Sequence, residues 1–256
     1  MHESLAFTNF LNHVFGAPVS GLLQKIGFHE AVPGVSSPLG FNTAAPFNDN
    51  FALELAVVLV LIGFFLIVRL TLNVEKPGPA QFMAETIHDF VGGQADQIIG
   101  HGYERYQPFV ASIFLFVLLC NMLGLIPGFE TPTADPKVPL GIAILTFIYY
   151  NYHGLREQGP VNYTKHFLGP IWWISWLMLP IEIISHLARV MSLTIRLFAN
   201  MFASDLLALV FFSLIPIGIP VIFLGLHFGV AFIQAYVFML LAMIYLTIAV
   251  THEEGH

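Results

Sequence analysis

One permanently charged side chain interrupts a long apolar run in this sequence: Ser192-Leu193-Thr194-Ile195-Arg196-Leu197-Phe198-Ala199-Asn200-Met201. An arginine does not lose its charge in a protein, and placing that charge at the depth of a bilayer core costs at least about 2.5 kcal/mol. The alternative is an arginine that extends to a lipid headgroup, as many do near helix ends. About ten apolar residues follow Arg196 before the next turn, which favours a functional role for the charge.

The composition around this stretch predicts a membrane protein built from helices. Of the 256 residues, 57% are hydrophobic and 10% are charged, and apolar runs of about 20 residues match the thickness of a bilayer core. The expected helices cover residues 51–72, 79–100, 107–127, 138–152, 171–213 and 219–250. We therefore expect an all-α polytopic fold with about five membrane-crossing helices. A single transmembrane domain would cover residues 51–252, between an N-terminal interfacial or extracytoplasmic segment (1–50) and a short cytoplasmic tail (253–256).

Two segments are expected to lie along the membrane surface rather than to cross it. Residues 79–100 alternate apolar and polar side chains at helical spacing, as in an amphipathic surface helix. Apolar residues also recur at helical spacing from Phe7 to Phe15, and the sequence Gly16-Ala17-Pro18 then predicts a break. The region from 171 to 213 is too long to cross once and upright, so it must tilt, break or lie partly along the membrane.

The nine Lys and Arg residues predict the orientation of the chain. With five crossings and the N-terminus outside, the cytoplasmic set comprises Arg69, Lys76, Arg105, Arg156 and Lys165. Only Lys25 and Lys137 then lie outside, while Arg189 and Arg196 stay within the membrane. Because cytoplasmic loops carry the excess of basic residues, we expect an outside N-terminus and a cytoplasmic C-terminus.

A polar stripe runs along one side of the predicted helix that contains Arg196. At about 100° per residue, one face collects Glu182, Ser185, His186, Arg189, Ser192, Arg196 and Asn200. Such a stripe in an apolar run is expected to line water or a polar partner, not lipid. Asp205 falls well away from the stripe and is expected to face a different neighbour.

The two last helices are expected to form an antiparallel hairpin around the turn near residues 213–220. Counting from its centre, Arg196 lies about 20 residues back and Gln234 about 19 forward, so these residues share a depth. Asp205 and His227 share a second depth, separated from the first by roughly 11–14 Å. An acid beside an imidazole can pass protons. The alternative for this pair, and for Gln234, is a hydrogen bond that only holds the helices together.

Metal, redox and nucleic-acid chemistry are not expected. Cys120 is the single cysteine, so no intramolecular disulfide can form. The segment His252-Glu253-Glu254-Gly255-His256 matches a zinc-protease pattern by letter only, because that motif needs a formed helix and a third ligand. We expect no metal, no cofactor and no nucleic-acid partner.

These residues together resemble subunit a of the F-type ATP synthase, bacterial type. The likeness rests on Ser192-Leu-x-x-Arg196-Leu-Phe-x-Asn200-Met, on the run from His227 through Gln234-Ala-Tyr-Val-Phe-Met, on Asn121-Met-Leu-Gly-Leu-Ile-Pro127 and on Leu179-Pro180-Ile181-Glu182. It covers roughly residues 45–252. Two departures are Asp135-Pro136-Lys137-Val138-Pro139, and His186 where an apolar residue is common.

The resemblance implies roles for individual residues. Arg196 would face the carboxylate of a ring of c subunits, with Gln234 supporting it from the last helix. Asp205 and His227 would line the periplasmic half-channel, although the family often has Glu at the first position. Glu182 and Asn200 would belong to the cytoplasmic access path, and Asn121 would be an auxiliary polar residue.

The implied function is proton translocation through two offset half-channels, coupled to rotation of the c ring and to ATP synthesis. The subunit itself would be non-catalytic. Its partners would be the c ring, the b subunits of the peripheral stalk and the lipid of a bacterial inner membrane. The alternative is a stand-alone proton-coupled transporter, which would need its own carboxylate at the midplane and usually paired halves.

Overall fold

The computed structural model describes residues 6–25, 49–73, 76–126, 129, 131–159, 175–214 and 219–250. Every regular element in these ranges is a helix, which confirms the prediction of an all-α fold. Among the described residues, three helices are long and apolar enough to cross a membrane: Asp49–Leu70, Trp176–Phe211 and Ile222–Val250. Gln107–Leu123 is a shorter apolar helix. The predicted tail, residues 253–256, lies outside the described ranges.

The chain divides into two compact units, Met1–Val60 and Leu61–His256. The first contains α1 (Ala6–Lys25) and the beginning of α2 (Asp49–Leu70). In this unit the hydroxyl of Thr8 donates a 2.6 Å hydrogen bond to Oδ1 of Asp49. The predicted break at Gly16-Ala17-Pro18 is wrong, because α1 continues through Pro18. A proline removes one backbone hydrogen bond of a helix, and a helix can bend there and continue.

The second unit holds the remaining helices. They are α3 (Pro79–Ile99), α4 (Gln107–Leu123), α5 (Lys137–Gln158), α7 (Ser175–Leu214) and α8 (Ile219–Val250), with two single 3₁₀ turns, η1 (Tyr103–Arg105) and η2 (Pro132–Ala134). α4 ends four residues before the expected position, at the glycine that follows Leu123. α5 continues six residues beyond the expected end, to Gln158.

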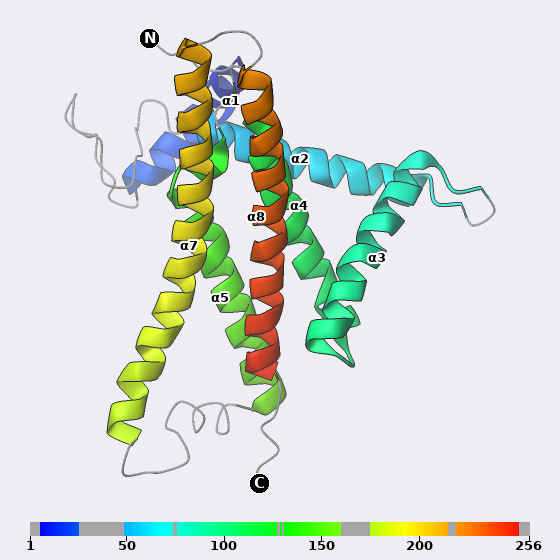
Figure 1. Ribbon diagram of the computed structural model, residues 1–256, viewed down its shortest axis with the longest axis vertical. Coiled ribbons are helices and arrows are strands. Elements are labelled where there is room, and N and C mark those ends of the chain that lie inside the picture. The colour runs from blue at the N-terminus through cyan, green and yellow to red at the C-terminus, as the bar shows by residue number, and fades with distance from the viewer. Residues whose placement is uncertain are drawn as a thin grey trace. The chain divides into compact units, whose positions relative to one another are not determined.

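Helix α8 is the centre of this unit and packs against α3, α4, α5 and α7. α7 and α8 lie side by side as the predicted hairpin (Figure 1). Alanines at positions 231, 235 and 242 of α8 are buried. In a membrane, apolar side chains gain little by leaving lipid, so close backbone approach at small residues provides much of the helix–helix contact.

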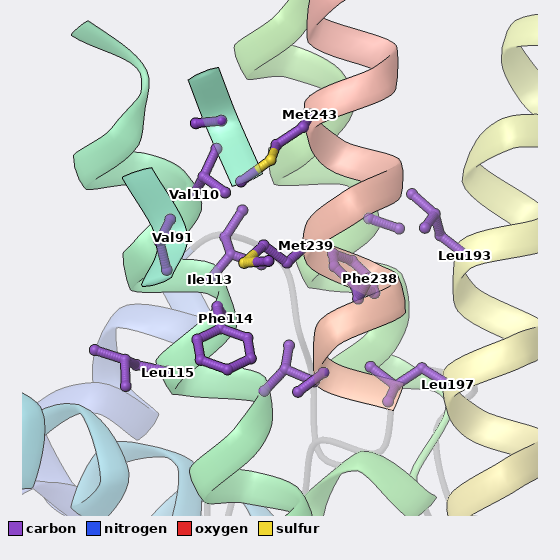
Figure 2. Packing of buried hydrophobic residues seen from close by; sticks show 14 of the residues in the cluster. Val91, Val110, Ile113, Phe114, Leu115, Leu193, Leu197, Phe238, Met239 and Met243 are labelled. Carbon is purple, nitrogen blue, oxygen red and sulfur yellow. The ribbon is translucent and has the colours of Figure 1, made fainter. Parts of the chain in front are cut away.

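The apolar core lies between α8 and its neighbours. Figure 2 shows Met239 and Met243 of α8 beside Ile113 and Phe114 of α4, while Leu197 approaches from α7. The flexible thioether side chain of Met fills irregular gaps of this kind. This packing determines which face of α8 turns toward α7. The polar side chains of α8 that contact α7 lie on that face.

On α7, buried residues follow one another at helical spacing. Leu193, Leu197 and Met201 are buried at intervals of four residues, as expected for one face of a helix. Ile195 and Phe202, on another face, are 54% and 46% exposed. The helix therefore presents one side to α8 and leaves another uncovered by the described part of the chain.

Candidate functional site

Three groups of polar side chains follow one another along α7. They are the pair Glu182 and His186, then Arg196 and Asn200, and finally Asp205. At a rise of about 1.5 Å per residue, Arg196 lies about 14 Å from Asp205 and about 21 Å from Glu182 along the axis. The exposed cation Arg196 thus lies between two acids, Glu182 and Asp205. Each acid lies beside a histidine.

His227 of α8 is the centre of the Asp205 group. Its side chain is 1% exposed. Its Nε2 atom lies 3.2 Å from the carbonyl oxygen of Asn121, and its Nδ1 atom lies 2.8 Å from the hydroxyl of Ser204 and 3.6 Å from Oδ1 of Asp205. A carbonyl only accepts, so Nε2 carries the hydrogen and Nδ1 of the neutral ring accepts from Ser204. A proton added at Nδ1 would therefore face the Asp205 carboxylate.

Residues from η2 and α4 complete this group. The hydroxyl of Thr131 donates to Oδ1 of Asp205 at 3.0 Å. The hydroxyl of Thr133 donates to Oδ1 of Asn121 at 2.6 Å, and the amide of Asn121 donates to the carbonyl of Ala231 at 3.3 Å. Four elements thus meet in one polar network, which is buried at His227 and Asn121 and partly exposed at Asp205. Such a network is costly to leave partly satisfied.

The predicted shared depth of Asp205 and His227 is confirmed. Asp205 was expected to face a different neighbour from the stripe; it does contact Thr131, but like Asn200 of the stripe it also contacts α8. Thr131, Thr133 and Ser204 were not predicted. The threonines come from a loop whose return to α7 leaves no periodic signal. Ser204 directly precedes Asp205 and could have been found by including every polar residue of the helix.

The network leaves no room for a side chain at Gly124. A Cβ atom there would lie 1.9 Å from the hydroxyl oxygen of Thr131 and 3.1 Å from the ring of His227. The backbone angle φ is −63°, which any residue adopts, so the constraint is contact alone. We predict that Gly124→Ala lowers the free energy of unfolding by about 1–3 kcal/mol.

Thermal unfolding of the purified protein in detergent measures this effect. Gly141→Ala is the matched control, because a Cβ atom at Gly141 meets nothing within 4 Å. Equal melting temperatures for the two variants would contradict the close packing of Gly124 against Thr131.

Arg196 and its neighbours form the middle group. Arg196 is exposed, and its Nη2 atom lies 3.5 Å from the hydroxyl of Ser192. Within the described ranges it forms no ion pair with a carboxylate. Beside it, the amide of Asn200 donates to Oε1 of Gln234 at 2.8 Å, and Gln234 is buried. The guanidinium therefore points from the hairpin to the side that the described chain leaves uncovered.

The sequence predicts that Arg196 and Gln234 share a depth. In the structure the hydrogen-bond partner of Gln234 is Asn200, one turn further along α7. The sequence predicts a turn centred at residue 215 or 216. In the structure α7 ends at Leu214 and α8 begins at Ile219, so the centre lies slightly later. Each residue by which the centre moves changes a cross-helix partner by two, so the four-residue change from Arg196 to Asn200 corresponds to a centre about two residues later.

The third group joins α7 to α5. Nε2 of His186 lies 3.3 Å from Oε1 of Glu182, and Nδ1 lies 2.8 Å from the hydroxyl of Tyr150. One turn further, the guanidinium of Arg189 lies 5.5 Å from the ring centre of Tyr245 on α8, within cation–π range. The predicted polar stripe of this helix includes His186 and Arg189, whereas no role was predicted for Tyr150.

The described residues contain no cluster of three or more His, Cys, Asp or Glu side chains that could hold a metal ion. The zinc-like segment from His252 to His256 lies outside the described ranges. The arrangement that is described is suited to holding and transferring protons, because histidine changes its charge near neutral pH and each histidine here faces a carboxylate.

The chain is similar to known proteins over most of its length. The family model for the ATP synthase A chain matches residues 51–247. ATP synthase subunit a of Koribacter versatilis is 49% identical over 256 residues, the full length of both chains. That of Solibacter usitatus is 44% identical over 211 residues, 82% of this chain and 91% of the relative. That of Sulfurimonas denitrificans is 49% identical over 183 residues, 72% of this chain and 82% of the relative.

Proposed function

The chain belongs to the ATP synthase subunit a family, a non-catalytic, proton-translocating part of the membrane sector in bacteria, and we propose that it provides two offset half-channels on either side of Arg196. One half-channel is the Asp205–His227 network. The other contains Glu182 and Asn200. Arg196, supported through Asn200 by Gln234, faces the carboxylate of a c-subunit ring.

A single observation carries this proposal. An exposed guanidinium without a carboxylate partner in the described chain lies on α7 between the carboxylates of Glu182 and Asp205, and each carboxylate lies beside a histidine. An intramembrane charge is expensive unless it is paired. The uncovered face of α7 therefore calls for an acidic partner beyond the described residues, and we assign this role to a ring carboxylate.

The proton would move in three steps. A ring carboxylic acid that faces lipid stays neutral because desolvation disfavours its charged form, and it ionises beside Arg196. The ionised group takes a proton from the Asp205–His227 path and turns away with the ring. At the end of the turn it gives the proton to the Glu182 path. The driving energy is about 2.3 kcal/mol per proton for each 100 mV across the membrane.

Arg196 keeps the two paths separate. Its charge attracts the ionised ring site, yet a guanidinium does not give up its proton and cannot relay one. Protons therefore cross only with rotation. Asn121 would hold the backbone carbonyl that orients His227, which makes it an auxiliary residue of the first path.

We also propose which subunits and which membrane surround the chain. The c ring would cover the exposed face of α7, and the b subunits of the peripheral stalk would bind elsewhere on the subunit. The membrane would be the bacterial inner membrane, with the N-terminus outside and the C-terminus in the cytoplasm, as the basic residues predict.

Asp205→Ala tests the first half-channel. We expect proton-driven ATP synthesis in inverted membrane vesicles to fall about tenfold without being abolished, because a positioned proton-transfer group is lost while water and His227 remain. Asp89→Ala is the control, since that carboxylate is 85% exposed on α3. An unchanged rate in the Asp205 variant would leave this carboxylate with a packing role only.

A further inference from the structure

The side chain of His186 forms a continuous line with Glu182 and Tyr150. The imidazole is 11% exposed and lies between the two partners, 3.3 Å from the carboxylate and 2.8 Å from the hydroxyl. The ring of Tyr150 is stacked near the imidazole, with centres 5.9 Å apart, and Phe147 contacts the imidazole edge-on. The imidazole is therefore held in one orientation by α5.

We propose that Glu182 and His186 act as one proton-sharing pair at the release end of the path, with Tyr150 holding the imidazole so that Nε2 faces the carboxylate. This inference rests on the proposed function and extends it. It adds His186 as a proton-carrying residue and Tyr150 as a positioning residue.

The chemistry of the pair explains why a second group is useful. A carboxyl group of ordinary affinity seldom holds a proton at neutral pH, whereas imidazole takes up and releases one in that range. A proton that reaches Glu182 moves to Nε2 of His186, so that the O–H bond breaks, an N–H bond forms and the carboxylate is restored. The imidazolium then gives the proton to water at the edge of Glu182, whose side chain is 27% exposed. Both groups return to their starting state.

The hydrogen bonds permit this sequence. When Nε2 is free to accept from Glu182, the neutral imidazole carries its hydrogen on Nδ1 and donates it to the oxygen of Tyr150. The hydroxyl of Tyr150 accepts in this state and can donate to Nδ1 in the other tautomer, so the same contact orients the ring in both. Tyr150 is buried and has little freedom to leave this position.

The surrounding charges favour release as well as uptake. On α7, the Glu182 carboxylate favours the imidazolium, while the guanidinium of Arg189 opposes it. α5 contributes Tyr150, and α8 contributes Tyr245, whose ring lies beside Arg189.

Passive proton flux through the membrane sector tests the pair. The complete complex in inverted vesicles, with its catalytic sector removed, is measured while the pH on the cytoplasmic side is varied from about 5.5 to about 8.5. We expect the native flux to show a titration step near neutral pH. His186→Gln can still form hydrogen bonds but cannot carry the charge, so flux should fall about tenfold and the step should disappear.

Two tyrosine variants separate relay from packing. Tyr150→Phe removes one oxygen atom, and we expect a smaller loss of flux with the step retained at a shifted midpoint. Tyr152→Phe is the matched control, because that residue is 59% exposed and lies on the same helix; its profile should be native. The amount of chain in the purified complex reports assembly, and if His186→Gln does not assemble, the Tyr150→Phe profile is decisive.

A native flux and a native titration step in His186→Gln would overturn the proposal, as would a native profile in Tyr150→Phe. These outcomes are distinguishable from a failure of the proposed function. If Arg196→Ala abolishes proton-driven ATP synthesis while the flux profile of His186→Gln is native, only the proton-sharing pair is rejected. If Arg196→Ala supports normal synthesis, the two half-channels are rejected.

Discussion

Arg196→Ala is expected to produce a complex that assembles but makes no ATP from a proton gradient. The side chain is exposed, and its contact with the described chain is a 3.5 Å approach to Ser192, so removing it costs the fold little. What is lost is the fixed charge that makes a passing ring carboxylate ionise. The rate of proton-driven synthesis should fall by at least about 100-fold, as when a preorganised electrostatic group is removed.

The measurement is ATP synthesis by inverted vesicles energised with a pH gradient, together with the amount of each subunit in the purified complex. Arg69→Ala is the control, since it removes an equal charge from the last turn of α2, outside the site. Synthesis at the native rate by the Arg196 variant would show that the charge is not needed for coupling.

His227→Gln is expected to have the second largest effect. Glutamine can still bond to Ser204 and to the carbonyl of Asn121, but it cannot take a proton beside Asp205. If the histidine carries protons, flux should fall about tenfold or more even though the network is held. If it only joins the helices, the substitution should be nearly neutral.

Ser204→Ala is the matched variant for this test. It removes the 2.8 Å contact to Nδ1 of His227 and leaves the imidazole and Asp205 in place. We expect a modest loss of flux from it. Equal losses in Ser204→Ala and His227→Gln would mean that the network has a structural role and that the proton passes elsewhere.

The hairpin and its polar residues could be predicted because both follow from the helical period. A stripe of polar residues on an apolar helix identifies one face, and counting from a turn gives the depth of each residue to within about one turn. That precision sufficed for Asp205 and His227. For Gln234 the prediction was about one turn off, because a change of about two residues in the centre of the turn moves its partner from Arg196 to Asn200.

The parts of the site contributed by non-periodic segments could not be predicted. Thr131 immediately precedes the short turn η2 and contacts Asp205 across 74 residues of sequence, and nothing in the sequence indicates where that turn folds back. Tyr150 is one of several tyrosines near the end of α5, and only the packing of α5 against α7 distinguishes it. The ends of helices were also inexact, as the extension of α5 to Gln158 illustrates.

The most direct test of the central claim is whether the face of α7 that carries Arg196 contacts the c ring. Cys120 is buried and would be replaced by alanine, so that a single cysteine at Ala199, exposed and one turn from Arg196, can be paired with a cysteine beside the ring carboxylate. A cysteine at Ile148 of α5, 61% exposed, is the control. The account predicts a disulfide from position 199 to the ring and none from position 148. Failure of position 199 to cross-link, in an assembled and active complex, would contradict it.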